Sequence, residues 1–419
     1  MAPAPSRSQS PSTTFLRITS RPSAAPALLL LSACTLLLSS CGSFFSCEGK
    51  ASCPCATGVT STTTNPCTGG GTGSTTVDYA YVTNSSSADT TIDGYNLGAG
   101  TLVAATSAPF VLGYVPSSMV VTPGNTFLYA ATDSVLDSGN GYVYGYSIGT
   151  GGALSIISSG DSLVPGEDIS SLAVSPDGQY LFCLDTIGTL LEEYSINAST
   201  GALTFLDSYP VGPVASGLNA TPAQVTVAPS GDFVVVALGQ GGAETFTLDE
   251  TTGAATASKL LTPTSSATGI YAAAVDVNNY IYLAGTNNLS VYSATTAGVP
   301  TFLNSYATGT GTDHSVVVNT AGTYVYTGNE STSTIYGFSI GTNAALSAVS
   351  GSPFTGPTTV NALAFDSTMA YLIASGYNAS TGIQLFTVGS TGALTAVTTS
   401  GTAGTGTTTA VPGAIAATH

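Results

Sequence analysis

The chain has 419 residues, of which 49 are glycine and only 6% are charged. A composition this poor in charged helix formers, and rich in Thr, Ser, Val and Tyr, disfavours long surface helices and predicts an all-β protein. With 22 acidic residues against 5 basic ones, the formal charge is −17, so the surface repels nucleic acid and anionic lipid. The expected partners are therefore neutral or cationic.

Residues 1–40 have the features of a signal peptide. Arg7, Arg17 and Arg21 precede the apolar run 27–38, and no acidic residue occurs in this segment. A transmembrane helix is the alternative, but the run is shorter than the roughly 20 residues that span a bilayer. The segment therefore predicts export. Its removal would also remove every arginine of the chain.

Cys41 follows the apolar run closely, and the residues around it bear on where the protein is located. The segment Leu38-Ser39-Ser40-Cys41-Gly42 resembles the lipobox of bacterial lipoproteins, in which the cysteine is acylated and becomes the new N-terminus. The resemblance implies lipid attachment at Cys41, with Cys34 as the competing site. It also implies a location in the bacterial cell envelope, at the outer membrane or the periplasmic or extracellular face. Contact with the membrane would then be made only through the anchor.

Residues 41–76 are rich in Thr, Ser, Gly and Cys and lack apolar periodicity, which is typical of a tether. The segment contains Cys47, Cys53, Cys55 and Cys67. These cysteines could form two disulfides or remain free thiols, and the sequence leaves both possibilities open. Zinc is disfavoured because Cys-Pro-Cys lacks the usual two-residue spacer and no histidine lies nearby. We therefore expect no metal here, and we expect Cys183 to be a small buried apolar residue.

From residue 77 onward the sequence repeats itself. A short apolar strand followed by a turn recurs every 43 to 53 residues, centred on Met119, Leu172, Val225, Ala273, Val316 and Leu363. Each is followed by a second apolar strand, and then by a third strand that ends in a Thr-Gly-Ala-Leu type of turn. Four short strands separated by Gly, Asn and Asp turns make one blade of a β-propeller.

The repeats count to seven blades if the two ends of the domain are combined. Blade one lacks its first strand near residue 79, whereas residues 412–419 form a half-repeat that places Ile415 in the position of Met119. We therefore predict a domain over residues 77–419 that is a seven-bladed β-propeller of four-stranded antiparallel blades, closed when the C-terminal strand completes blade one. Closure removes free sheet edges, so we expect a monomer. A β-solenoid would leave the half-repeat unexplained.

The segment Tyr81-Val82-Thr83-Asn84, together with the Pro-Asp-Gly and Pro-Ser-Gly turns, resembles the YVTN-repeat and lactonase-type propellers, which include 6-phosphogluconolactonase-like proteins. The resemblance covers about residues 77–419 and implies a place for the family's chemistry in blade six. There the family carries Gly-Pro-Arg-His before one strand and Asn-Glu after the next. In this alignment Glu330 takes the position of the family's carboxylate, His314 that of its arginine, and Ala223 that of its histidine.

The positions of His314 and Glu330 suggest a site. Each lies eight residues from Gly322, so the two can face each other across a hairpin at one mouth of the central channel. A histidine oriented by a carboxylate can act as a general base on water, which predicts a catalytic pair for lactone hydrolysis. The alternative is a hydrogen-bonded pair at the strand ends. Asp133 occupies the position of Glu330 in blade two, and Asp185 in blade three lies one residue short of it. Both are predicted to bind ligand at the same mouth.

Other chemistry finds less support. The loop with Asp133, Asp137 and Asn140 could ligate calcium, but these residues are also good turn formers. No phosphate-binding Gly-x-x-x-x-Gly-Lys loop occurs, and no cofactor is implied. Two functions remain: a module that binds a neutral or cationic small molecule or an envelope protein, or a hydrolase that opens a small lactone ring. A phosphorylated lactone is disfavoured because no arginine follows residue 21.

Overall fold

The computed structural model describes residues 78–84, 90–97, 100–114, 116–132, 141–157, 164–165, 168–212, 219–249, 252–261, 269–376, 382–397 and 412–419. The predicted signal peptide, the tether and every cysteine except Cys183 lie outside these residues, as do Asp133, Asp137 and Asn140. Cys183 is buried, as expected. No helix within the described ranges is long and apolar enough to cross a membrane.

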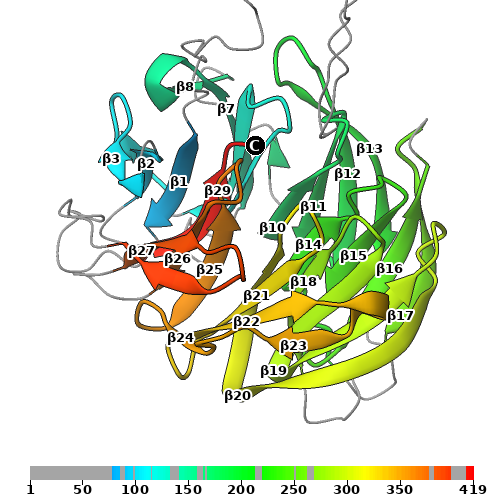
Figure 1. Cartoon of the computed structure of the whole chain (residues 1–419). Helices are drawn as coiled ribbons and strands as arrows, with labels where there is room; N and C mark the ends of the chain where they lie inside the picture. Colours follow the sequence, from blue (N-terminus) through cyan, green and yellow to red (C-terminus); the bar gives the residue numbers. More distant parts are fainter. Residues whose placement is uncertain are drawn as a thin grey trace, which may run out of the picture. The chain divides into compact units, whose positions relative to one another are not determined.

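The regular secondary structure of the described residues is almost all β-strand, arranged in antiparallel blades (Figure 1). Blade one contains β29 (Pro412–Ala417), β1 (Tyr79–Asn84), β2 (Thr91–Asn96), β3 (Val103–Ala104) and β4 (Phe110–Val111). Blade two contains β5 (Pro116–Val121), β6 (Phe127–Thr132), β7 (Tyr142–Ile148), β8 (Leu154–Ile156) and β9 (Val164–Pro165), with a short 3₁₀ helix, η2 (Thr150–Gly152). Blade three contains β10 (Ile169–Val174), β11 (Tyr180–Asp185), β12 (Leu190–Ile196) and β13 (Leu203–Pro210). Blade four contains β14 (Gln224–Val227), β15 (Phe233–Ala237), β16 (Ala243–Leu248) and β17 (Ala255–Leu261).

Blades five and six share one sheet. It contains β18 (Ile270–Val275), β19 (Tyr280–Ala294), β20 (Pro300–Val318), β21 (Tyr324–Asn329), β22 (Thr334–Ile340), β23 (Leu346–Ala348) and β24 (Phe354–Thr355), with η3 (Thr342–Ala344). The long strand β20 pairs with β19 through residues 300–307 and at Thr312, and with β21 through residues 313–318. It is therefore both the outer strand of blade five and the inner strand of blade six. Blade seven contains β25 (Val360–Phe365), β26 (Tyr371–Gly376), β27 (Ile383–Val388) and β28 (Leu394–Ala396).

The inner strands form a closed circuit. Each contacts the inner strand of the next blade, in the order β29, β5, β10, β14, β18, β20, β25 and back to β29. The closing strand β29 pairs with β1, with Ile415 opposite Val82. The strands β29 and β1 lie side by side in Figure 1. The prediction that the C-terminal strand completes blade one is therefore confirmed.

The core is divided among the blade interfaces. Seven clusters of buried apolar side chains each join two neighbouring blades, including blades seven and one. Each blade therefore buries both faces against its neighbours, which explains the near-continuous apolar second strands, such as β6 and β11.

Tyrosines add a polar link across three of these interfaces. The hydroxyls of Tyr81, Tyr129 and Tyr326 each donate to a glycine carbonyl of the following blade, at 2.9, 2.8 and 2.5 Å. The accepting glycines lie in the Thr-Gly-Ala-Leu type of turn and have positive φ, as Gly392 does at 79°. A Cβ at Gly392 would also lie 2.4 Å from the Tyr324 ring. The repeated turn therefore has a structural cause, because glycine fits both the backbone conformation and the space.

A second link joins the inner strands themselves. The Ser171 hydroxyl accepts a hydrogen bond from the backbone N–H of Val225 in the next blade at 3.1 Å. Equivalent bonds run from Leu172 to Ser118 and from Leu363 to Ser315. These serines lie one residue before the centre of each inner strand, so a small hydroxyl at this position stabilises the ring.

Candidate functional site

The structure brings His314 and Glu330 together. The His314 Nε2 atom lies 2.9 Å from a Glu330 carboxylate oxygen, and the two side chains are 34% and 35% exposed. His314 lies on β20, and Glu330 follows the last residue of β21. A neutral imidazole that donates its Nε2–H to the carboxylate keeps the Nδ1 lone pair for water or substrate.

The contact depends on a β-bulge. Asp313 pairs with Asn329 and Ser315 with Gly328, so the register shifts at His314. The hairpin is therefore offset by one residue from the symmetric pairing that the sequence suggests, and His314 is the extra residue of the bulge. Bulges redirect side chains at sheet edges and next to sites, and here the bulge turns His314 toward Glu330.

The bulge recurs at the start of other inner strands. Register shifts occur at the same place in four further blades, and the residues passed over are Ser117, Ser170, Tyr271 and Asn361. These residues therefore share with His314 the same place in the repeat. Tyr271, from the neighbouring blade five, lies with its ring centre 5.1 Å from that of His314, inclined by 45°. Tyr271 is a site residue that the sequence reasoning missed, although the repeat alignment places it level with His314.

A buried polar cluster lies next to the pair. The Asp313 carboxylate is fully buried and accepts hydrogen bonds from the Thr308 hydroxyl and from the Asn329 amide, the latter at 2.9 Å. Burial raises the pKa of Asp313 to about 7, against the opposing effect of these two hydrogen bonds. The Asn329 side-chain oxygen in turn accepts from the backbone and hydroxyl of Thr332. The cluster fixes the residues that immediately precede His314 and Glu330, and nothing in the sequence marks Asp313 as buried.

The other predicted site residues are placed differently. Asp185 is fully buried, and its carboxylate accepts backbone N–H groups of Asp168, Ile187 and Gly188 at 3.3, 3.0 and 2.5 Å. This arrangement occupies both carboxylate oxygens of Asp185 and shapes the turn after β11. Asp133 and the predicted calcium loop lie outside the described residues, as does Cys41. Within the described ranges no group of three His, Cys, Asp or Glu side chains is placed to hold a metal ion.

Blade four has no acid or base at the corresponding place. Ala223, which aligns with the family's histidine, donates its backbone N–H to the Ala237 carbonyl at 2.9 Å, and its side chain packs against the core between blades four and five. Since the chain also lacks arginine beyond residue 21, the pair His314 and Glu330 stands without the two other groups that the resemblance implies.

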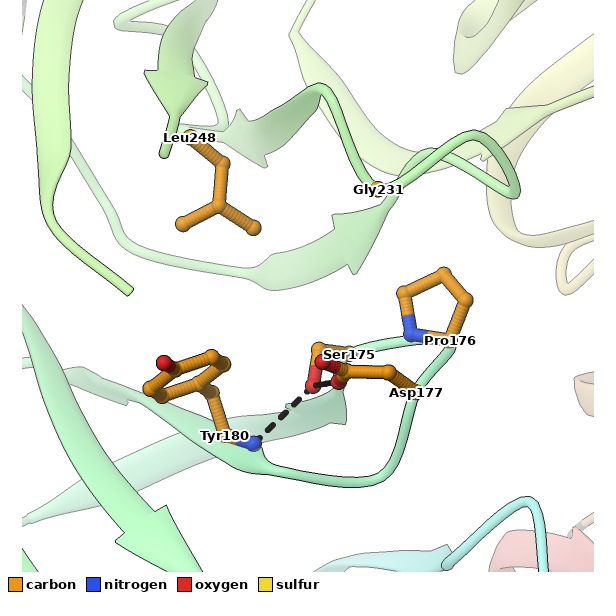
Figure 2. A pocket seen from close by; sticks show the side chains of 6 residues that line it. All are labelled: Ser175, Pro176, Asp177, Tyr180, Gly231 and Leu248. Atoms are coloured by element: carbon orange, nitrogen blue, oxygen red, sulfur yellow. Dashed lines mark hydrogen bonds between the residues drawn. The ribbon is translucent and has the colours of Figure 1, made fainter. Parts of the chain in front are cut away.

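A separate hollow of about 280 Å³ lies between blades three and four (Figure 2). Its polar groups are occupied by the turn that precedes β11: Ser175 donates to Asp177 at 2.5 Å and accepts from the Tyr180 backbone at 2.9 Å. Figure 2 shows the ring of Tyr180 and the side chain of Leu248 on facing walls. The hollow contains no acid–base pair of the kind seen at His314.

Comparison with known proteins identifies the family. The sequence profile described as "Lactonase, 7-bladed beta-propeller" matches residues 80–411. No curated protein sequence matches the chain. Among solved structures, the periplasmic gluconolactonase of Pseudomonas aeruginosa aligns with a TM-score of 0.65 at 13% identity, covering 82% of this chain and 99% of that one.

Two further structures align in the same way. A Bacteroides fragilis protein whose name describes it as a 6-phosphogluconolactonase aligns with a TM-score of 0.64 at 15% identity, covering 83% of this chain and 99% of that one. A Lactobacillus plantarum protein gives 0.65 at 16% identity, with coverage of 82% and 99%. At identities of 13 to 16%, these structures show only that the fold is similar. Together with the profile match over most of the domain, they show that the chain belongs to the lactonase family of seven-bladed β-propellers.

Proposed function

We propose that this chain is an envelope hydrolase that opens a small, uncharged lactone, with His314 as general base and Glu330 as the group that orients it. The observation that carries the proposal is the 2.9 Å contact between the imidazole and the carboxylate, both of which remain accessible to water. The lactonase names of two structural relatives support the reaction class. Lipid attachment through Cys41 belongs to the proposal, and the periplasmic relative supports the envelope location.

The proposed reaction uses water as the only co-reactant. The Nδ1 lone pair of His314 takes a proton from water while the oxygen attacks the lactone carbonyl carbon. The ring C–O bond then breaks, and the leaving oxygen takes up that proton, so that one lactone and one water give one hydroxy acid. Because the chain is strongly acidic, it repels the carboxylate product, which favours release.

A second candidate is a module that binds a neutral or cationic small molecule or an envelope protein without turning it over. Ala223 in place of the family's histidine favours this candidate, since it leaves His314 as the sole acid–base histidine at this mouth among the described residues. Both candidates use the same mouth of the channel. Turnover distinguishes them.

The test is acid release from a panel of neutral lactones, including glucono-δ-lactone, by the purified full chain at pH 7 above the uncatalysed rate. We expect His314→Ala to lower kcat by a factor of about 10² to 10⁴, as is usual for the loss of a general base. Glu330→Gln should cause a smaller loss, and Ser170→Ala, the same bulge position in blade three, should cause none. Turnover that survives both site substitutions would refute the assigned site, and absence of turnover would favour the binding module.

The lipid anchor has its own test. Palmitate labelling of the expressed chain should be lost in Cys41→Ala and retained in Cys34→Ala. The reverse pattern would move the anchor to Cys34, and labelling that survives both substitutions would remove the anchor from the proposal.

A further inference from the structure

The channel has a second end with a different chemistry. His314 lies near the start of the inner part of β20, whereas two adjoining cavities of about 450 and 520 Å³ lie further along the inner strands, where these strands enter their turns. The two cavities share Gln224, Thr226 and His419 in their walls. Their volumes are those of small-molecule sites in proteins.

The side chains that line these cavities are mostly apolar. The walls are formed by backbone and side chains of the inner strands, for example Val316–Val318 and Leu363–Phe365, and their polar side chains are Gln224, Thr226, Thr320 and His419. Among the described lining residues there is no Asp, Glu, Lys or Arg. A charged ligand would lose hydration here without gaining a charged side chain as a partner, so the cavity favours a neutral ligand.

His419 supplies the polar contact. Its backbone is held by Asn125, which accepts from the His419 N–H at 2.8 Å and donates to its carbonyl at 2.6 Å. Desolvation by the channel walls lowers the pKa of the imidazole, and a hydrogen bond with the Val121 backbone opposes this shift. A neutral imidazole has one donor and one acceptor nitrogen. When one nitrogen donates to the Val121 carbonyl, the other keeps a lone pair that can accept a hydrogen bond.

We propose that this end of the channel binds an uncharged, mostly apolar small molecule that donates one N–H or O–H group to His419. The apolar walls supply the affinity, and the imidazole selects for a donor. The site is separate from His314 and Glu330, so it does not depend on lactone hydrolysis.

Indole is a suitable probe, because it is neutral and apolar and has one N–H donor. The protein contains no tryptophan, so indole fluorescence can be excited at the red edge of its absorption with little contribution from the 21 tyrosines. Titration of indole with the purified full chain should shift its emission to the blue in a saturable way, with a Kd below about 1 mM. The matched probe 1-methylindole lacks the donor and should bind about two- to tenfold more weakly, the usual effect of one hydrogen bond.

Variants locate the binding. Thr226 lines both cavities, so Thr226→Phe places a bulky ring in them and should abolish the shift of indole emission. If Thr226→Phe does not fold, Ala364→Phe serves the same purpose and should have the same effect. His419→Phe should remove the difference between the two probes, whereas His314→Ala should leave both affinities unchanged. Absence of a saturable shift, equal binding of the two probes to the unmodified chain, or unchanged binding in a folded Thr226→Phe or Ala364→Phe variant would each overturn the proposal.

Discussion

Glu193 allows a quantitative test of how burial governs the stability of this fold. It lies on β12 and is fully buried at the interface of blades three and four. One carboxylate oxygen accepts a hydrogen bond from the Tyr209 hydroxyl at 3.2 Å. Burial raises the pKa of Glu193 from 4.5 to about 7, and hydrogen bonding with Tyr209 and with the Ala255 backbone opposes this rise. The ionised form is therefore poorly stabilised in the folded protein.

The sign and size of the effect follow from linkage. A raised folded-state pKa contributes stability that is fully present below the unfolded pKa, near 4.5, and is lost as the pH rises through 7. The loss amounts to about 1.4 kcal/mol per pH unit, or about 3 kcal/mol in all. Glutamine has nearly the same shape and no charge, so Glu193→Gln should exceed the unmodified chain's free energy of unfolding by about 1 kcal/mol at pH 5 and by about 3 kcal/mol at pH 8.

The assay is urea denaturation of the full chain and of Glu193→Gln at pH 5, 6, 7 and 8. Glu244 and Asp313, whose pKa values burial also raises to about 7, affect both proteins equally and cancel in the difference. Ser171→Ala, which removes a hydroxyl and no titratable group, is the control and should give a difference that does not change with pH. A pH-independent difference for Glu193→Gln, or a variant less stable than the unmodified chain at pH 8, would refute the reasoning.

Three further predictions concern the ring itself. Tyr326→Phe removes the hydroxyl that donates to the Gly392 carbonyl and should lower the free energy of unfolding by about 1 to 2 kcal/mol, measured by urea denaturation. Ser171→Ala leaves the buried N–H of Val225 without its acceptor and should cost about 1 to 3 kcal/mol in the same assay, whereas an unchanged midpoint would show that water replaces the hydroxyl. Deletion of residues 412–419 removes β29, so it should abolish the single cooperative unfolding transition followed by circular dichroism. If these residues were only a tail, the transition would be unchanged.

The sequence predicts the ring well because the repeat carries the information. Ile415 aligns with Met119, and the structure pairs it with Val82 in blade one. The shared sheet of blades five and six was missed, although Ala273 and Val316 show the shortest spacing in the repeat, 43 residues. That spacing leaves no residues for a separate connection, so β20 runs directly from one blade into the next.

The candidate site was less predictable. The equal spacing of His314 and Glu330 from Gly322 predicts that the two residues face each other. In the structure they meet through a β-bulge, and no particular residue type marks a bulge in the sequence. Burial of Asp313 depends on Thr308 and Asn329, which approach it only after the hairpin forms. Sequence patterns report periodicity along a strand, and these features arise from contacts across strands.

The continuous strand β20 also determines where the chain can be cut. Its two ends are paired with β19 and β21, and in the segment between them the Gly311 N–H donates to Asn287 and the Thr312 carbonyl accepts from the Glu330 N–H. A protease needs several residues of backbone free of such bonds to fit its cleft. Limited proteolysis of the native chain should therefore yield no fragment that ends between residues 300 and 318, and blades five and six should be recovered as one piece.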